Sequence, residues 1–135
     1  MEGSLKELAI YRLERAEEML HDSEQNYKMK QYRTSLNRSY YAVFHSMRAM
    51  NTLDGFDSSK HSGVIAHFNR YIIKTGKLEK KFSEVVKKTS YLREKSDYDD
   101  FYVASANEAQ EQLDNAQEFV QAVKAYLNII ISDGE

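Results

Sequence analysis

No proline occurs anywhere in the 135 residues of this chain, and only five residues are glycine. Proline breaks helices and glycine weakens them, so their scarcity permits long uninterrupted helices. Charged residues make up 30% of the chain and hydrophobic residues 41%, a balance typical of helices with one solvated and one buried face. We therefore predict an all-α fold in a single domain, residues 1–135, because this length suits one hydrophobic core.

Charge and composition narrow the possible partners. The formal net charge of -2 gives no general attraction to nucleic acid, so we predict no DNA binding, and any RNA contact would need a local basic patch. The chain has no cysteine, which removes disulfides and thiolate metal sites. His61 and His67 are six residues apart, outside the spacing of two zinc ligands on one helix face, so we expect no metal and no cofactor. No apolar run has the length of a membrane span, which favours a cytoplasmic protein without membrane contact.

Apolar residues recur every three or four positions in five segments, as they do in amphipathic helices. We expect helices over about residues 5–27, 30–53, 58–75 and 78–94, and from 105 through 127. Residues 95–104 break the periodicity, and we expect them to form a loop.

Local signals mark several of the expected helix ends. Ser4 with Glu7, and again Ser105 with Glu108, have the spacing of a capping box at a helix start. Asp54-Gly55 has the turn chemistry that ends a helix, which places the end of the second helix near residue 53.

The expected second helix carries an apolar stripe that we predict to face the core. At about 100° per residue, its members gather on one side of the helix. They are Leu36, Tyr40, Val43, Met47 and Met50.

Arg38 and His45 lie on the opposite side of that helix. Being seven residues apart, they fall within about 20° of each other and about 10 Å apart along the axis. Tyr41, Ala42 and Ala49 share this face, where a solvated helix would carry Glu and Lys. We therefore expect a second surface to pack there, most simply the same face of a second copy in a two-fold dimer.

Four ordered motifs give the sequence a resemblance to a known family. Asn37-Arg-Ser-Tyr-Tyr-Ala-Val-Phe-His45 resembles the HEPN signature, an Arg followed by four to six residues and a His, as found in the small stand-alone bacterial and archaeal (UPF0332-like) group. Lys60-His-Ser-Gly-Val-Ile65, Lys74-Thr-Gly76 and Arg93-Glu-Lys-Ser-Asp-Tyr98 are similar to the later motifs of that group, in the same order. The resemblance extends from about residue 8 to residue 127.

The resemblance implies an up-and-down four-helix bundle with an additional short helix, five helices in total, that dimerises through the face of Arg38 and His45. In many HEPN members that pair is the active site of a metal-independent endoribonuclease, often the toxin of a toxin–antitoxin pair whose antitoxin is a minimal nucleotidyltransferase. Some of these antitoxins add AMP to a tyrosine two residues after the His, a position that is Met47 here. Other members bind nucleotides or proteins without known catalysis.

RNA cleavage without a metal needs a proton acceptor for the 2′-hydroxyl and a cation for the charge on the phosphate. Imidazole titrates near neutral pH, so His45 is the candidate for proton transfer. A guanidinium binds phosphate oxygens in pairs, which suits Arg38 to the scissile phosphate. As substrate-binding candidates, Asn37 would donate to a phosphate or base edge and Tyr41 would stack on a base. His61, at the expected start of the third helix, either lines the same cleft or has a structural role.

Three hypotheses therefore stay open. The first is a homodimeric HEPN endoribonuclease of the toxin type, with Arg38 and His45 as catalytic residues. The second is a noncatalytic HEPN module that binds a nucleotide or a nucleotidyltransferase partner in the same cleft. The third is a structural helical dimer in which the Arg and the His satisfy each other.

Overall fold

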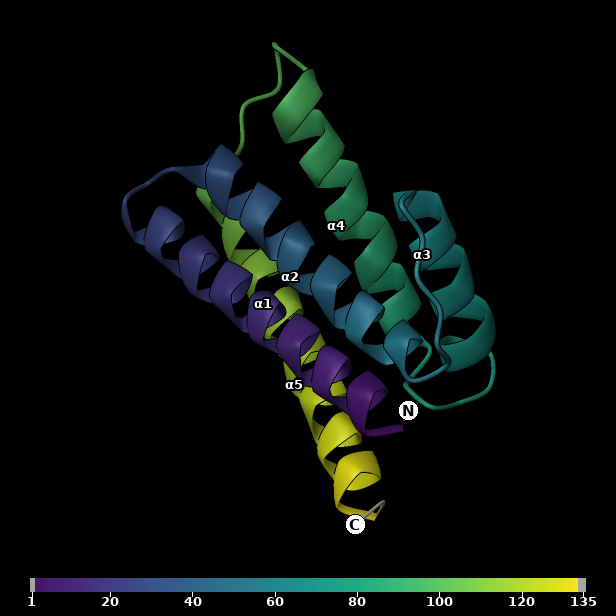
Figure 1. Ribbon diagram of the computed structural model, residues 1–135. Helices are drawn as coiled ribbons and strands as arrows, with labels where there is room; N and C mark the ends of the chain where they lie inside the picture. Colours follow the sequence, from purple (N-terminus) through teal and green to yellow (C-terminus); the bar gives the residue numbers. More distant parts are fainter. Residues whose placement is uncertain (1, 134–135) are drawn as a thin grey trace.

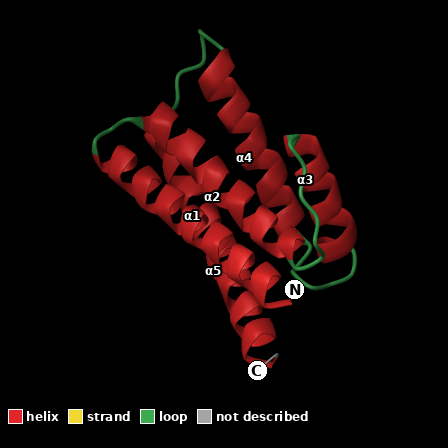
Figure 2. Cartoon of the chain, in the orientation of Figure 1, coloured by secondary structure: helices red, strands yellow, loops and turns green. Residues whose placement is uncertain are grey.

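Helices account for almost all of the chain in the computed structural model, which describes residues 2–133 (Figures 1 and 2). Within that range there is no strand, so the predicted all-α fold of five helices is confirmed. The helices are α1 (Glu2–Lys28), α2 (Tyr32–Thr52), α3 (His61–Phe68) with its π-helical continuation η1 (Asn69–Ile73), α4 (Lys81–Tyr98) and α5 (Ala106–Asp133). None of them is both long enough and apolar enough to cross a membrane.

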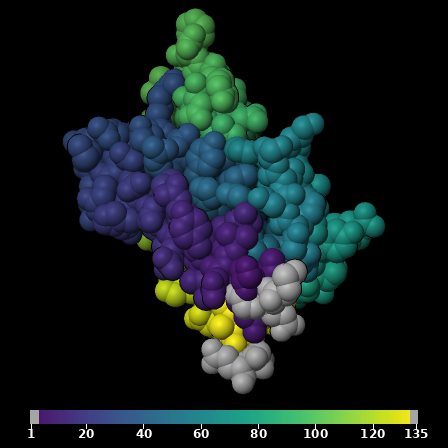
Figure 3. Space-filling view, in the orientation of Figure 1, coloured from purple at the N-terminus to yellow at the C-terminus, as the bar shows by residue number. Residues whose placement is uncertain are grey.

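The central element is α2, which packs against each of the other four α-helices. Figure 1 shows α1 and α4 on either side of it, α5 behind it and the short α3 at its C-terminal end. In Figure 3 the segment around residue 100 projects at one end of the molecule. A helix surrounded in this way must be apolar or small on almost every side. Accordingly, 13 of the 21 residues of α2 are buried.

Four residues of the predicted apolar stripe of α2 lie in the main core cluster, and Leu36 packs in a second cluster with Leu92 and Ala109. Each of the five residues of the stripe is at most 1% exposed. Aromatic rings from other helices complete the core: Phe119 of α5 lies 5.5 Å from Phe68 and 5.4 Å from Phe82, measured between ring centroids. Burial of one such side chain contributes about 1.5–3 kcal/mol, so this stripe accounts for much of the stability of the bundle.

Two alanines on α2 do not lie where the sequence predicted. Ala42 and Ala49 were expected to face a second subunit, but both are 0% exposed within the single chain. The side of α2 that carries them belongs to the intramolecular core, in the same cluster as Ala9 and Ala16 of α1. Small side chains let two helices approach closely, which explains alanine at these positions without a second copy.

Of the two predicted capping boxes, the structure confirms one and contradicts the other. At the start of α5, the Glu108 amide donates to Ser105 Oγ at 3.0 Å and the Ser105 amide donates to the Glu108 carboxylate at 3.4 Å, so the second box is confirmed. The first box is wrong, because α1 already runs from residue 2 and Ser4 lies inside it. The predicted turn after α2 is confirmed at Gly55, whose φ of +70° is a conformation that glycine adopts without strain.

The fourth helix is shifted along the chain from its predicted position. It was expected over residues 78–94 and instead covers Lys81–Tyr98, so the first part of the expected 95–104 loop is helical. Its last turn is supported by the ion pairs Arg93–Asp97 and Lys95–Asp99, each at 3.5 Å and four residues apart. Polar residues extend this helix, which is why apolar periodicity missed its end. The third helix also starts later than expected, at residue 61.

Candidate active site

One narrow edge of α2 remains partly accessible. From residue 35 to the end of the helix, the only positions that are not buried are Asn37, Arg38, Tyr41, His45 and Arg48. Their spacing of one, three, four and three residues keeps them along one line of the helix. The structure therefore places Arg38 and His45 on the same edge of α2, with Tyr41 between them.

At the N-terminal end of this edge, Arg38 is held by its neighbour. Its Nη1 donates to Asn37 Oδ1 at 2.6 Å, and Asn37 Nδ2 donates to Asp97 Oδ2 of α4 at 3.0 Å. Asn37, predicted to bind substrate, thus links Arg38 to α4. An open hollow of about 470 Å³ lies here, lined by Arg33, Thr34, Asn37, Arg38, Ser96 and Asp97. A guanidinium fixed at the wall of an open hollow is suited to bind a phosphate group.

At the other end of the edge, His45 lies among aromatic rings. Its ring centroid is 6.1 Å from that of Tyr41 and 5.8 Å from that of Phe44. His61, the first residue of α3, joins the same cluster, with its centroid 4.2 Å from Phe44 and 5.9 Å from Tyr41. The structure therefore brings together three of the predicted site residues, Tyr41, His45 and His61.

The two histidines differ in their hydrogen bonds. Nδ1 of His61 lies 2.9 Å from the hydroxyl of Tyr40, which gives that imidazole a structural partner. Nδ1 of His45 is buried and has no hydrogen-bond partner within the described residues. Buried polar atoms are normally satisfied, so an imidazole without a partner on a partly open helix edge is a candidate for function.

The surroundings of His45 favour its neutral form. Burial is the main cause, and the nearby cations Arg48, Arg15 and Arg12 add to it; together they lower the pKa of His45 to about 4. Burial and Arg93 also lower the pKa of His61. A neutral imidazole at pH 7 can accept a proton but has none to spare for a leaving group. At pH 7 His45 is therefore in the protonation state that a general base needs, and its lowered pKa makes it a weaker base than an ordinary histidine.

The predicted site forms two groups rather than one. No hydrogen bond joins Arg38 to His45 among residues 4–132, and their positions on α2 separate them by about 10 Å along the axis. The first group is Arg38 with Asn37, and the second is His45 with Tyr41 and His61. A substrate that contacts both groups must lie along the edge of α2, as an extended chain would.

Sequence reasoning missed three arginines near the site. The guanidinium of Arg93 lies 4.7 Å from the ring centroid of Tyr40 and 5.7 Å from that of Tyr41, within the range of cation–π attraction. Arg12 and Arg48 add positive charge around His45. Arg48 follows His45 by three residues, so helical spacing alone could have placed it on the same edge. Arg12 and Arg93 come from other helices. Arg93 begins the last of the four motifs, but its spacing along the chain does not place it beside α2, and no motif includes Arg12.

The described residues contain no group of three or more His, Asp or Glu side chains that could hold a metal ion. The two histidines of the site contact aromatic rings, and His61 also lies within hydrogen-bond distance of the Tyr40 hydroxyl.

Comparison with known proteins identifies the family to which the chain belongs. The family model of the HEPN domain matches residues 9–126, most of the chain. The chain therefore belongs to the HEPN domain family, as the four motifs predicted.

Several relatives match over most of their length. A UPF0332 protein of Thermotoga maritima is 32% identical over 110 residues, which cover 82% of this chain and 83% of the relative. A Methanocaldococcus jannaschii protein named "Putative toxin MJ0605" is 33% identical over 119 residues, 88% of each chain. Another from that organism, named "Putative toxin MJ0142", is 30% identical over 115 residues, 85% of this chain and 78% of the relative.

Proposed function

We propose that this protein is a metal-independent endoribonuclease of the toxin type, with Arg38 and His45 as its catalytic residues. The observation that carries the proposal is His45 itself, a neutral imidazole on the accessible edge of α2 whose buried Nδ1 has no hydrogen-bond partner. Arg38 lies two turns earlier on the same edge. The names of the two Methanocaldococcus jannaschii relatives support the toxin assignment.

In the proposed reaction, His45 takes the proton of a ribose 2′-hydroxyl. The 2′ oxygen then bonds to the adjacent phosphorus, and the bond from phosphorus to the 5′ oxygen of the next nucleotide breaks. The 5′ oxygen takes up a proton from water, and His45 returns its proton to the hydroxide that this leaves. Arg38 binds the phosphate and offsets the charge that develops on its oxygens. The products are a 2′,3′-cyclic phosphate and a 5′-hydroxyl.

We further propose that the protein acts as a homodimer through the edge of α2 and that a minimal nucleotidyltransferase is its antitoxin. Two copies of this edge, facing each other, would bring two Arg38–His45 pairs to one cleft. Asn37, Tyr41 and His61 would line this cleft, the first by orienting Arg38 and the other two by offering ring faces to the bases.

The decisive test is cleavage of RNA by the purified protein in EDTA. We expect the wild type to leave 2′,3′-cyclic phosphate ends, and Arg38→Ala and His45→Ala to lose at least a hundredfold in rate. His21→Ala, an exposed histidine of α1, is the matched control. Circular dichroism and mass measurement in solution establish that all four proteins have the same fold and oligomeric state.

The proposal fails if the wild type cuts no RNA, or if the Arg38 and His45 variants cut as fast as the His21 variant. Nucleotide binding to the same cleft would then be measured, because a noncatalytic HEPN module is the alternative function.

A further inference from the structure

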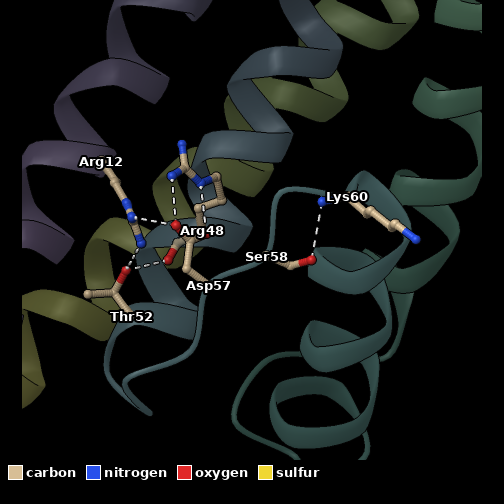
Figure 4. A network of polar contacts seen from close by, with 6 residues as sticks. All are labelled: Arg12, Arg48, Thr52, Asp57, Ser58 and Lys60. Carbon is tan, nitrogen blue, oxygen red and sulfur yellow. Dashed lines mark hydrogen bonds and ion pairs between the residues drawn. The ribbon is translucent and has the colours of Figure 1, made fainter.

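Two arginines from different helices converge on one carboxylate next to the candidate site (Figure 4). Arg12 of α1 donates from Nη2 to Asp57 Oδ2 at 3.0 Å. Arg48 of α2 donates to the same carboxylate from Nη2 at 3.2 Å and from Nε at 3.4 Å. Asp57 belongs to the loop between α2 and α3, so a single loop residue pairs with cations of two helices.

The cluster has an excess of positive charge even when Asp57 is in place. Two guanidinium groups carry two charges, and Asp57 supplies one negative charge. Arg15, the third cation near His45, has its own partner, Glu18, at 2.8 Å. One unit of positive charge therefore remains beside the imidazole, on the side away from Arg38.

The two arginines are held differently. Arg12 also donates from Nη1 to Thr52 Oγ1 at 2.6 Å, and its side chain is only 11% exposed. Its position therefore does not depend on Asp57 alone. The contacts of Arg48 with Asp57 are long, and the side chains of Arg48 and Asp57 are 26% and 47% exposed. Partly exposed ion pairs of this kind contribute little to stability, so the Arg48–Asp57 pair can open at small cost, and Arg12 retains Thr52 as a partner when Asp57 moves away.

A phosphodiester can replace the carboxylate of Asp57 as the partner of these two arginines. Both groups carry one negative charge shared between two oxygens, and arginine binds both in the same paired geometry. Arg48 is three residues beyond His45 on the accessible edge of α2. An RNA strand lying along this edge would thus pass from Arg38, over His45, to the cluster of Arg12 and Arg48.

We infer that Arg12 and Arg48 form a phosphate-binding subsite for RNA beside His45, and that Asp57 occupies this subsite until an RNA phosphate displaces its carboxylate. The inference rests on the proposed function in taking RNA as the ligand. It adds two binding residues, and it makes the α2–α3 loop a competitor of the substrate.

The experiment measures binding of a fluorescent, fully 2′-O-methylated RNA by anisotropy in EDTA. This probe lacks the 2′-hydroxyl, so it cannot be cleaved by the proposed reaction. Asp57→Asn removes the competing charge, and we expect it to bind about fivefold or more tightly than the wild type. Arg48→Gln removes a phosphate contact, and we expect about tenfold weaker binding with a salt dependence reduced by about one released counterion.

Matched controls come from the ion pair Lys124–Glu17 between α5 and α1, whose side chains are 44% and 41% exposed. Glu17→Gln changes the net charge as Asp57→Asn does, and Lys124→Gln changes it as Arg48→Gln does. The inference is overturned if Asp57→Asn binds no more tightly than Glu17→Gln, or if Arg48→Gln binds as well as Lys124→Gln.

Folding of each variant is checked by circular dichroism and thermal unfolding. If Arg48→Gln does not fold, Asp57→Asn still decides, because a purely structural role for the carboxylate predicts no gain in affinity. A wild type that binds the probe but cuts no RNA refutes the ribonuclease and leaves these comparisons valid. If the wild type cleaves RNA but Asp57→Asn and Arg48→Gln bind the probe as their controls do, only the proposed subsite is refuted.

Discussion

The hydroxyl of Tyr40 lies 2.9 Å from Nδ1 of His61, so the middle of α2 is joined to the first residue of α3. Burial of Tyr40 is the main reason that its pKa is raised to about 12, so the hydroxyl stays protonated and its contact with the imidazole is a hydrogen bond to an uncharged phenol.

Replacement of Tyr40 by Phe should remove this bond and leave the imidazole nitrogen without its partner. We expect the free energy of unfolding to fall by about 1–2 kcal/mol, measured by urea denaturation at pH 7. Tyr11→Phe is the control, since Tyr11 is 60% exposed. Equal unfolding midpoints for the two variants would show that the Tyr40–His61 bond does not stabilise the fold.

The lowered pKa of His45 predicts that stability depends on pH. With a pKa of about 4 in the folded protein against 6.5 for the ordinary group, the unfolded chain binds the extra proton between these values. His45 therefore costs no stability above about pH 6.5, and stability falls as the pH decreases toward 4, by at most about 3 kcal/mol.

Urea denaturation at several pH values, with His45→Gln as the comparison, isolates this contribution. The wild type should lose stability relative to the variant as the pH falls from 6.5 to 4. A difference that stays constant over this range would mean that His45 has an ordinary pKa in the folded protein.

The same pKa makes a prediction about the rate of the proposed reaction. A general base with a pKa of about 4 stays deprotonated well below neutrality, so kcat/KM at pH 5.5 should be close to its value at pH 7. An unperturbed histidine would instead lose about tenfold over this interval. RNA cleavage by the folded wild type at a series of pH values distinguishes the two, and a midpoint near 6.5 would refute the prediction.

The burial of Ala42 leads to a prediction about α2. Because this residue is 0% exposed inside the chain, Ala42→Leu should overpack the core and lower the free energy of unfolding by about 1–3 kcal/mol. Thr34→Leu, at an exposed position of the same helix, should change it little. If Ala42→Leu unfolds at the wild-type denaturant concentration, then α2 and its neighbours are less tightly packed than the structure shows.

Much of this fold could be predicted because its signals are local. The apolar stripe of α2 follows from helical periodicity, and the capping box of Ser105 and Glu108 follows from spacing alone. The end of α4 could not be predicted in this way, because its last turn is supported by ion pairs and by Arg93 and Ser96, which are buried although polar. A pattern of apolar residues does not indicate such buried polar residues.

In the candidate site, too, relationships within one helix could be predicted and contacts between different elements could not. Arg38 and His45 share one helix, so their common edge follows from the sequence. The bond from Asn37 to Asp97 and the approach of Arg12 to the site both join residues on different elements. Ala42 shows the corresponding error: periodicity assigns a residue to a face of the helix but does not tell whether another helix of the chain or a second copy covers that face.

Because α2 packs against all four other α-helices, most of its amide groups beyond the first turn can exchange only when those helices separate from it. Hydrogen exchange in α2 should therefore require unfolding of the whole bundle, whereas residues 99–104 between α4 and α5 exchange through local fluctuations. The edge that carries Arg38 and His45 would then be the part of the molecule that keeps its shape longest as the rest loosens.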